Sequence, residues 1–396
     1  MAKGNVVIAQ GGGPTQVINA SLYGAVREAM ARLEDSAEIW GARHGIAGAL
    51  ERRWWNLRRQ PRGLWEQVRL SPGSALGSSR KMLSAQEAAE AVRIFREKDV
   101  RHFVCIGGND SMDSAMKMAK AAEALNYELR IAGVPKTIDN DLPHTDHCPG
   151  YGSAARYIAQ SAIDLGTDVR TLPSPVSILE VMGRNAGWLT AATMLARQEP
   201  DDAPHLIYTC ETPLEAERFL RDVREVHQRL GWVVAAVSEG LKDERGKPWS
   251  VPRAAAAADG FGHPLPGDVA TTLAGLVTAE LGLRARSEKP GLLGRSSQLL
   301  ASEVDRREAE EAGRFAVACM LEGRSGFMAA IQRESDSPYR VSYRAVALAE
   351  VANVERKLPP EYLTPERNHI QESFRAYVEP LIGGPLLRYA RLAEAP

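Results

Sequence analysis

The residues best suited to chemistry stand in residues 134–141, where an apolar run ends in Lys136, Thr137, Asp139 and Asp141. A carboxylate can take a proton from a hydroxyl group while a cation neutralises a phosphoryl group in transfer. Asp139 and Asp141 point to the same side if the backbone stays extended, because side chains alternate along a strand. The set fits phosphoryl transfer, although a turn rich in Asn and Asp has the same composition.

Two glycine clusters, at residues 11–13 and 107–108, each follow another apolar run. A helix that begins after such a turn has unpaired backbone N–H groups that bind phosphate well. In the second turn, Asn109 and Asp110 place an amide and a carboxylate beside those donors. Glycines at such turns also serve tight backbone geometry alone, and an Asp can simply cap the helix. We interpret both turns as phosphate-facing loops, with these alternatives open.

An α/β fold is expected to position these segments, because apolar runs alternate with helical patterns, as in parallel sheets covered by helices on both faces. Capping boxes at Ser84 with Glu87 and at Thr212 with Glu215 predict two helix starts. Residues 242–268 mix an alanine run with Gly, Pro and Asp, which predicts an irregular crossing between domains. The predicted strands lie at residues 6–9, 103–106, 131–134, 176–181, 206–208 and 232–237.

Length and composition indicate an enzyme-sized globular protein. A chain of 396 residues is expected to form two or three domains. Its net charge of -1 gives no overall attraction to nucleic acid or to a membrane surface. The 4 cysteines lie far apart, without the spacing of a disulfide framework or zinc site, and no signal segment or membrane-spanning run is present. A cytoplasmic location is therefore expected.

Taken together, the motifs resemble the phosphofructokinase family, and in particular its pyrophosphate-dependent branch. The similarity spans about residues 5–330, and residues 354–363 also resemble the tails of that branch. It implies two similar Rossmann-like α/β domains with mostly parallel sheets, a homodimer or homotetramer, and dependence on Mg2+. The motifs are the two glycine turns, residues 135–141, residues 180–184 (EVMGR) and residues 238–240 (SEG).

By this resemblance Asp139 is the general base for the C1 hydroxyl of fructose 6-phosphate, with Lys136 and Asp110 as further catalytic residues. Asn109 and Asp110 are the implied metal ligands, although relatives usually have an acidic residue at position 109, and an amide is a poorer magnesium ligand. Arg80 is the least distinctive of the implied donor residues, because an exposed arginine is equally a solvated surface charge. The implied donor-binding residues are Gly11, Gly12, Gly108, Asn109 and Arg80. The implied sugar-phosphate residues are Thr137, Ile138, Asp141, Met182, Gly183, Arg184, Glu239, Arg286 and Arg295.

Asp110 and Ser114 bear on the phosphoryl donor. ATP-using relatives have glycines there that leave room for the nucleotide, so the Asp110 carboxylate would clash with and repel its α-phosphate. Lys136, where many ATP users have Gly, resembles the lysine that pyrophosphate enzymes place on the donor. The two residues favour a pyrophosphate-dependent 6-phosphofructokinase that acts reversibly in glycolysis and gluconeogenesis.

Two alternatives stay open: an ATP-dependent 6-phosphofructokinase, and a non-catalytic paralogue that binds sugar phosphates. A nicotinamide dehydrogenase is disfavoured, because residues 11–13 followed by Pro14 do not match the G-x-G-x-x-G turn. Whether sedoheptulose 7-phosphate is also a substrate is left open. We expect a donor domain of residues 1–152 and 268–304, a sugar-phosphate domain of residues 153–267 and 305–345, and a C-terminal extension of residues 346–396.

Overall fold

The computed structural model describes residues 2–173, 175–250 and 268–392, and it divides into two compact units. Among these residues, unit 1 comprises 2–154 and 295–356, and unit 2 comprises 155–250, 268–294 and 357–392. The chain thus passes between the units more than once, as expected. The predicted crossing at residues 242–268 falls largely outside the described residues.

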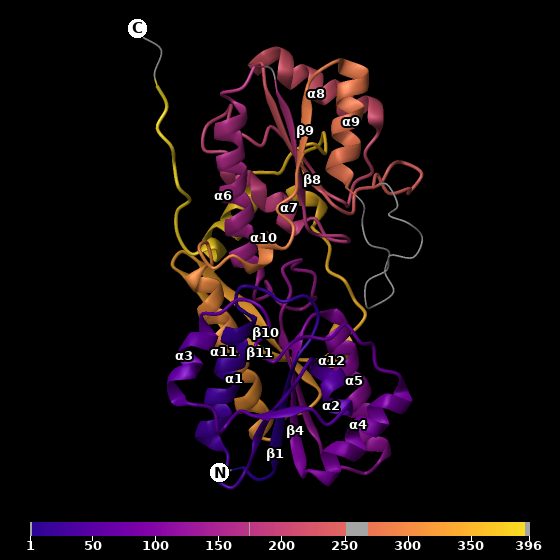
Figure 1. Cartoon of the computed structure of the whole chain (residues 1–396), viewed down its shortest axis with the longest axis vertical. Helices are drawn as coiled ribbons and strands as arrows, with labels where there is room; N and C mark the ends of the chain where they lie inside the picture. Colours follow the sequence, from indigo (N-terminus) through magenta and orange to yellow (C-terminus); the bar gives the residue numbers. More distant parts are fainter. Residues whose placement is uncertain (1, 174, 251–267, 393–396) are drawn as a thin grey trace. The chain divides into compact units, whose positions relative to one another are not determined.

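Unit 1 is built on a seven-stranded sheet with the order β11-β10-β5-β4-β1-β2-β3 (Figure 1). The five central strands run parallel, and the edge strands β3 and β11 are antiparallel to their neighbours. The strands are β1 (Asn5–Gln10), β2 (Ile39–Ala42), β3 (Trp54–Asn56), β4 (Val100–Gly107), β5 (Arg130–Pro135), β10 (Phe327–Asp336) and β11 (Tyr339–Ala347). The helices are α1 (Ile18–Arg32), α2 (Gly45–Leu50), α3 (Arg62–Arg69), α4 (Ala85–Glu97), α5 (Asn109–Ala124), α11 (Glu303–Leu321) and α12 (Leu348–Val351).

Both faces of this sheet are covered, which explains the continuous apolar runs in its strands. Val6 and Ile8 of β1 face the core that contains α1 and α11. Val7 and Ala9 face the core that contains α4 and α5. Figure 1 shows these two helix pairs on opposite sides of the sheet.

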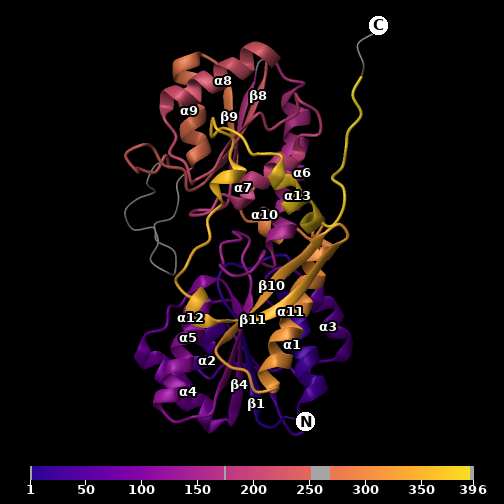
Figure 2. The same ribbon diagram turned by 180° about the vertical axis from the view of Figure 1, so that it is seen from behind.

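Residues 295–356 lie in unit 1 and residues 268–294 in unit 2, whereas the sequence assigned 305–345 to the sugar-phosphate domain and 268–304 to the donor domain. The reason is pairing and packing: β10 pairs with β5, and α11 packs on α1 in the same core. Buried His147 ties α11 to the loop after β5, because its Nδ1 and Nε2 atoms lie 2.7 Å from Asp146 of that loop and 2.7 Å from Glu308 of α11. Figure 2 shows the hairpin of β10 and β11 and the short helix α12 that follows it.

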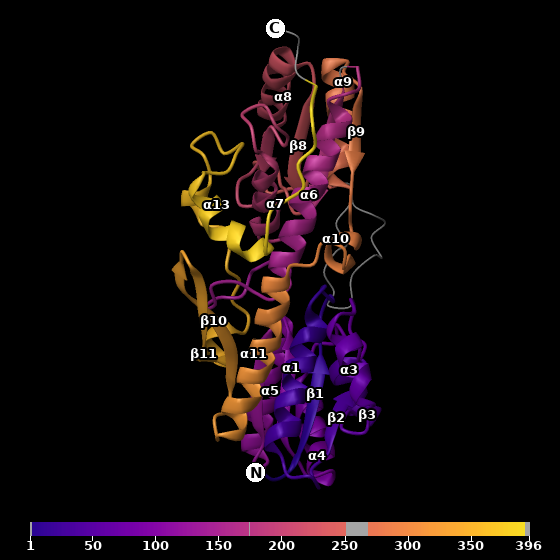
Figure 3. The same ribbon diagram turned by 90° about the vertical axis from the view of Figure 1, so that its left-hand side faces the viewer.

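Unit 2 has a parallel four-stranded sheet with the order β7-β8-β6-β9. Helices α8 and α9 cover one face, and α6 contributes Val169 to a smaller cluster that includes Trp232 and Val234. The C-terminal tail runs along α6 (Figure 3), where Leu387 N donates to Gln160 Oε1 at 2.8 Å. The strands are β6 (Val176–Val181), β7 (Leu206–Tyr208), β8 (Val233–Ser238) and β9 (Ala285–Glu288). The helices are α6 (Tyr151–Val169), α7 (Trp188–Ala192), η1 (Thr193–Ala196), α8 (Ala216–Leu230), α9 (Val269–Leu281), α10 (Leu293–Ser296), η2 (Pro360–Tyr362), α13 (Ser373–Val378) and η3 (Glu379–Ile382), of which α6 and α10 also extend into unit 1.

The predicted mostly parallel α/β fold, with helices on both sheet faces, is confirmed. The capping box of Ser84 and Glu87 is present at the start of α4. The box predicted at Thr212 is wrong, because α8 begins at Ala216 and its N-cap, Glu215, makes no side-chain cap hydrogen bond. Leu214 N instead donates to Lys242 O at 2.9 Å, so this segment is joined to the loop after β8 before the helix starts.

Candidate active site

The turns singled out in the sequence meet at one edge of the unit 1 sheet. Strands β5, β4 and β1 are parallel neighbours, so their carboxyl ends lie side by side, where α/β sheets commonly bind ligands. Gly11 N donates to Ile106 O at 2.9 Å, and Lys136 N donates to Gly107 O at 3.0 Å. Both glycine turns and residues 135–141 thus form one connected surface.

Lys136 lies buried at the centre of this surface. Its Nζ donates to Gly13 O at 2.7 Å. A Cβ atom at Gly13 would lie 2.2 Å from Nη1 of Arg295, so only glycine allows that guanidinium to approach the turn. Burial, reinforced by the positive charge of Arg295 and less strongly by that of Arg80, lowers the pKa of Lys136 to about 8. We call Lys136, Arg295 and Arg80 the donor-side cluster.

The segment before Arg80 is fastened to the first glycine turn. Gly12 N donates to Ser79 O at 3.0 Å, and Ser78 Oγ donates to Gly12 O at 2.5 Å. Ser79 also forms an isolated bridge with Gly11. These contacts hold the backbone that carries Arg80 beside Lys136.

Asp139 and Asp141 do not share one side of an extended strand, because the strand ends at Pro135 and Asn140 has a φ of 56°. The backbone of residues 139–141 is therefore not extended, which was the condition for the two carboxylates to point to the same side. Asp139 N donates to Thr137 Oγ1 at 3.1 Å. Ile138 is buried.

Asp141 is a largely buried carboxylate whose Oδ1 has no hydrogen-bond partner among the described residues. Burial raises the pKa of Asp141, and the nearby carboxylate of Glu355 raises it further. A buried oxygen without a partner is a candidate ligand atom.

The amide of Asn109 binds backbone. Its Oδ1 accepts from Asn353 N at 2.5 Å, and its Nδ2 donates to Val354 O at 2.6 Å. Asp110 is left as the acidic side chain in the first turn of α5. Within residues 2–173, 175–250 and 268–392, no three His, Cys, Asp or Glu side chains gather as a metal site.

Asp110 and Ser114 line a cavity of only about 20 Å³, enough for about one water molecule. These are the two positions at which the sequence predicted exclusion of a nucleotide. The other lining residues are Ala9, Gln10, Gly11, Ile46, Ser79, Lys81, Phe103, Cys105 and Ser111.

In unit 2, the two predicted sugar motifs meet at the carboxyl ends of β6 and β8. Glu239 N donates to Val181 O at 2.9 Å, and Gly183 N donates to Glu239 Oε1 at 3.3 Å. A Cβ at Gly240 would lie 1.7 Å from Arg184 O, so the close approach of these turns requires glycine. Burial raises the pKa of Glu239 against the opposing effects of the Gly183 amide and the Arg184 charge. Met182 lies in the same turn as Gly183.

Arg286 does not lie beside these turns within unit 2. Arg286 on β9 is paired with Ser177, four residues before Val181, which is about 13 Å along a strand. Arg295 belongs to unit 1 and lies beside Gly13. The predicted role of both as a sugar 6-phosphate clamp stays a prediction.

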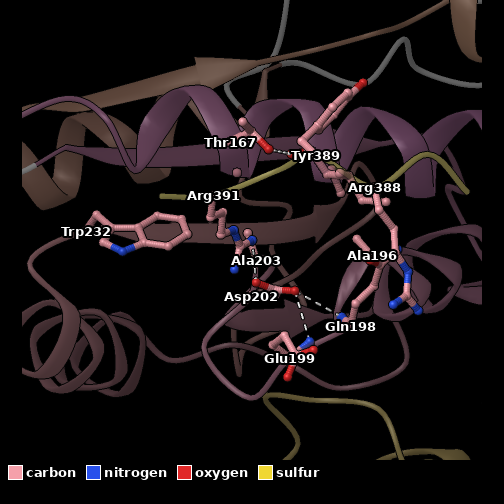
Figure 4. A pocket seen from close by; sticks show the side chains of 13 residues that line it. Thr167, Ala196, Gln198, Glu199, Asp202, Ala203, Trp232, Arg388, Tyr389 and Arg391 are labelled. Atoms are coloured by element: carbon pink, nitrogen blue, oxygen red, sulfur yellow. Dashed lines mark hydrogen bonds and ion pairs between the residues drawn. The ribbon is translucent and has the colours of Figure 1, made fainter. Parts of the chain in front are cut away.

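A second cavity, of about 220 Å³, lies in unit 2 between α6, the loop after η1 and the C-terminal tail (Figure 4). Arg391 of the tail lies 2.6 Å from buried Asp202, which also accepts from the backbone N of Gln198 and Glu199. None of the predicted site residues lines this cavity.

Arg356 contacts the backbone of the loop that follows Asp139, and sequence reasoning missed it. The only signal was the resemblance of residues 354–363 to the tails of the pyrophosphate-dependent branch, which says nothing of what Arg356 touches. The residues after about 344 otherwise carry no recognisable motif.

Comparison with known proteins identifies the family. The family model described as Phosphofructokinase matches residues 5–320. The chain belongs to the phosphofructokinase family. The matched range contains both glycine turns, residues 135–141 and residues 180–184.

Similar proteins include the pyrophosphate–fructose 6-phosphate 1-phosphotransferase of Xanthomonas campestris pv. campestris, 42% identical over 97% of this chain and 93% of that protein. The enzyme of the same name from Methylococcus capsulatus is 38% identical over 97% of this chain and 93% of its own length. The crystal structure of a pyrophosphate-dependent phosphofructokinase from Marinobacter aquaeolei aligns with a TM-score of 0.87 at 34% identity, covering 98% of this chain and 94% of that one. No described helix is long and apolar enough to cross a membrane.

Proposed function

We propose that this chain transfers a phosphoryl group reversibly from pyrophosphate to the C1 hydroxyl of fructose 6-phosphate. The products are fructose 1,6-bisphosphate and phosphate, in a step of glycolysis and gluconeogenesis. The observation that carries the proposal is the donor-side cluster, in which Lys136, Arg295 and Arg80 gather at the first glycine turn. Relatives that share most of this chain's length are named for the same reaction.

The donor-side cluster suits a small, highly charged anion. Three cationic side chains and the backbone of the first glycine turn converge within unit 1. With a pKa of about 8, Lys136 is mostly protonated at pH 7, and an incoming polyanion holds that proton more firmly. Charge that develops on the transferring group would be stabilised by groups already in place.

ATP is disfavoured by the side chains that follow the second glycine turn. Asp110 and Ser114 fill space at the start of α5, where the family resemblance places the nucleotide of ATP-using relatives, and the cavity that they line holds only about 20 Å³. The Asp110 carboxylate adds repulsion between like charges. Pyrophosphate lacks these groups and avoids both effects.

In the proposed reaction, Asp139 takes the proton from the sugar C1 hydroxyl as its oxygen attacks the donor phosphorus. Lys136 and Arg295 are proposed to bind the phosphate oxygens of pyrophosphate. The phosphate that is not transferred leaves as inorganic phosphate. In unit 2, Arg184 and Glu239 are proposed to bind the sugar phosphate, with Glu239 as a hydroxyl acceptor.

Magnesium would be held by few protein groups. Asn109 is engaged with the backbone of residues 353 and 354, which leaves Asp110 and the unpartnered Oδ1 of Asp141 as candidate ligands. Mg2+ commonly binds through one or two carboxylates together with substrate phosphates. The ion would neutralise charge on the donor. We propose that it binds together with pyrophosphate and that the chain acts as a homo-oligomer in the cytoplasm.

The test is the initial rate of fructose 1,6-bisphosphate formation with pyrophosphate and with ATP, each with and without magnesium. Activity with pyrophosphate and magnesium is expected. Activity with ATP alone would overturn the donor assignment, and silence with both would favour the non-catalytic reading.

Asp110→Gly tests the donor argument directly. Removing the carboxylate should raise kcat/KM for ATP relative to pyrophosphate by about 10-fold or more. Glu123→Gly, on the exposed part of the same helix, is the matched control and should leave the ratio unchanged. An unchanged ratio in Asp110→Gly would refute the role of Asp110 in excluding ATP.

A further inference from the structure

Residues 353–356, which follow α12, lie against the loop that carries the proposed general base. Arg356 Nη1 donates to Thr145 O and to Asp146 O, both at 2.7 Å. Its Nη2 and Nε donate to Asn140 O at 2.9 and 3.3 Å. The backbone N of Arg356 donates to Asp141 O at 2.7 Å. One residue thus binds four backbone carbonyls of residues 140–146.

This arrangement requires a guanidinium group. Three of the carbonyls converge on one planar side chain, whose five N–H groups are fixed in a fork. A lysine ammonium has three donors at one point and cannot span the same acceptors. Without the guanidinium, the carbonyls of Asn140, Thr145 and Asp146 would each lose the hydrogen bonds that it donates, and native backbones rarely leave such bonds unmade.

The loop held by Arg356 has backbone conformations that need support. Asn140 and His144 have φ values of 56° and 60°, in the left-handed region that few residues other than glycine adopt, although Asn and His adopt it more readily than most. Asn140 is fully buried, and its Oδ1 accepts from Cys148 N at 2.9 Å. Asp139 directly precedes Asn140, so its position depends on how this turn is held.

The other end of residues 353–356 is fastened to the second glycine turn. Asn109 binds both sides of the Asn353–Val354 backbone, as acceptor at 2.5 Å and donor at 2.6 Å. Asn353 Nδ2 also donates to Asp113 Oδ1 at 3.0 Å. An aspartate at position 109 could accept but not donate, so both bonds to this backbone require the amide.

We propose that residues 353–356 form a clamp that joins the donor-side turn at Asn109 to the loop of Asp139, with Arg356 as the positioning residue for that general base. The clamp fixes the carboxylate relative to the phosphoryl donor, so it acts on turnover more than on substrate binding. Its catalytic consequence rests on the proposed function, whereas the ordering of residues 139–148 does not.

The kinetic test compares Arg356→Ala, Arg356→Lys and the control Arg344→Ala, which removes an exposed arginine of β11 in the same unit. Arg356→Ala should lower kcat about 10- to 100-fold, the effect of misplacing a catalytic group by about 1 Å. KM for both substrates should change less than about 3-fold. Arg356→Lys should recover only part of the loss, and guanidinium ion in solution should partly restore kcat of Arg356→Ala but not change Arg344→Ala.

A kcat that stays at the wild-type value per folded molecule in Arg356→Ala would overturn the clamp, as would a loss confined to KM. If Arg356 had only a structural role, Arg356→Ala would lower the folded fraction but not kcat per folded molecule, and guanidinium ion would not restore kcat.

Amide hydrogen exchange gives a readout independent of activity. The amides of Asp146 and Cys148 are hydrogen-bonded, to Ile331 O at 2.8 Å and to Asn140 Oδ1 at 2.9 Å. Both amides should exchange faster in Arg356→Ala than in wild type. Their exchange rates should be unchanged in Arg344→Ala. Inactive wild-type protein would refute the proposed function alone, because exchange still decides whether Arg356 orders the loop. Unchanged exchange in Arg356→Ala would refute the clamp.

Discussion

Replacing Lys136 by methionine should make the folded chain more stable at pH 7 while removing its activity with pyrophosphate. Burial beside Arg295 lowers the pKa of Lys136 from its usual 10.5 to about 8. At pH values below 8 both the folded and the unfolded chains carry the lysine proton. Compared with a neutral side chain at position 136, the charged lysine then destabilises the folded state by about 3 kcal/mol. Methionine cannot make the hydrogen bond to Gly13 O, and this loss offsets about 1 kcal/mol of the gain in stability. The net gain expected for Lys136→Met is about 2 kcal/mol.

The pH dependence checks the sign. Between pH 8 and 10.5 the unfolded chain keeps the lysine proton and the folded chain has lost it, so wild-type stability rises with pH. The difference in unfolding free energy between Lys136→Met and wild type should therefore decrease by about 2 kcal/mol between pH 7 and 9.5. Urea unfolding at both pH values measures this, with Lys120→Met on the exposed face of α5 as the control.

A lower urea midpoint for Lys136→Met at pH 7 would refute this reasoning. It would mean that attraction to Asp139 and Asp141, which favours the charged lysine, outweighs the free-energy cost of burying it. Equal activity of the variant with pyrophosphate would separately remove Lys136 from the proposed mechanism.

Three further predictions concern the remaining site groups. Asp139→Asn should lower kcat by about 10²- to 10⁴-fold with little change in KM, and a steady-state assay showing ordinary turnover would exclude it as the base. Burial alone would lower the pKa of His147, but Glu308 and Asp146 raise it to about 9. The stabilisation from protonated His147 is full below about pH 6.5 and is lost as pH rises through 9. Urea unfolding should therefore show the largest loss of stability in His147→Gln at pH 6. A difference in unfolding free energy between wild type and His147→Gln that stays constant up to pH 10 would contradict this. Glu239→Gln should raise KM for fructose 6-phosphate about 10-fold, which substrate titration would reveal, whereas a rise in KM for pyrophosphate alone would place Glu239 elsewhere.

The sequence by itself determined the class of fold and most of the proposed donor side. Strands buried on both faces read as continuous apolar runs, so β6 and β7 were predicted with the bounds that the structure has. The glycine turns and residues 134–141 carry local signals, because a chain entering a tight turn at a strand end needs particular residue types. The structure pairs β5, β4 and β1 as parallel neighbours, and this pairing brings the turns together at one edge of the sheet.

Only the tertiary structure decided what depends on contacts between distant segments. Arg356 follows the loop that it binds by more than two hundred residues, and no local pattern marks such a partner. Asn109 looked like a weakened metal ligand until its amide was found on the backbone of residues 353 and 354.

Residues 305–345 were assigned to the sugar-phosphate domain but lie in unit 1, because helical periodicity predicts an apolar face but not the sheet that it covers. Arg286 and Arg295 were paired by the family resemblance, and only the structure shows that Arg286 stands on β9 of unit 2 and Arg295 beside Gly13 in unit 1. Residue type and spacing thus fix which chemistry a segment can do, whereas the pairing of strands and the packing of helices decide which segments do it together.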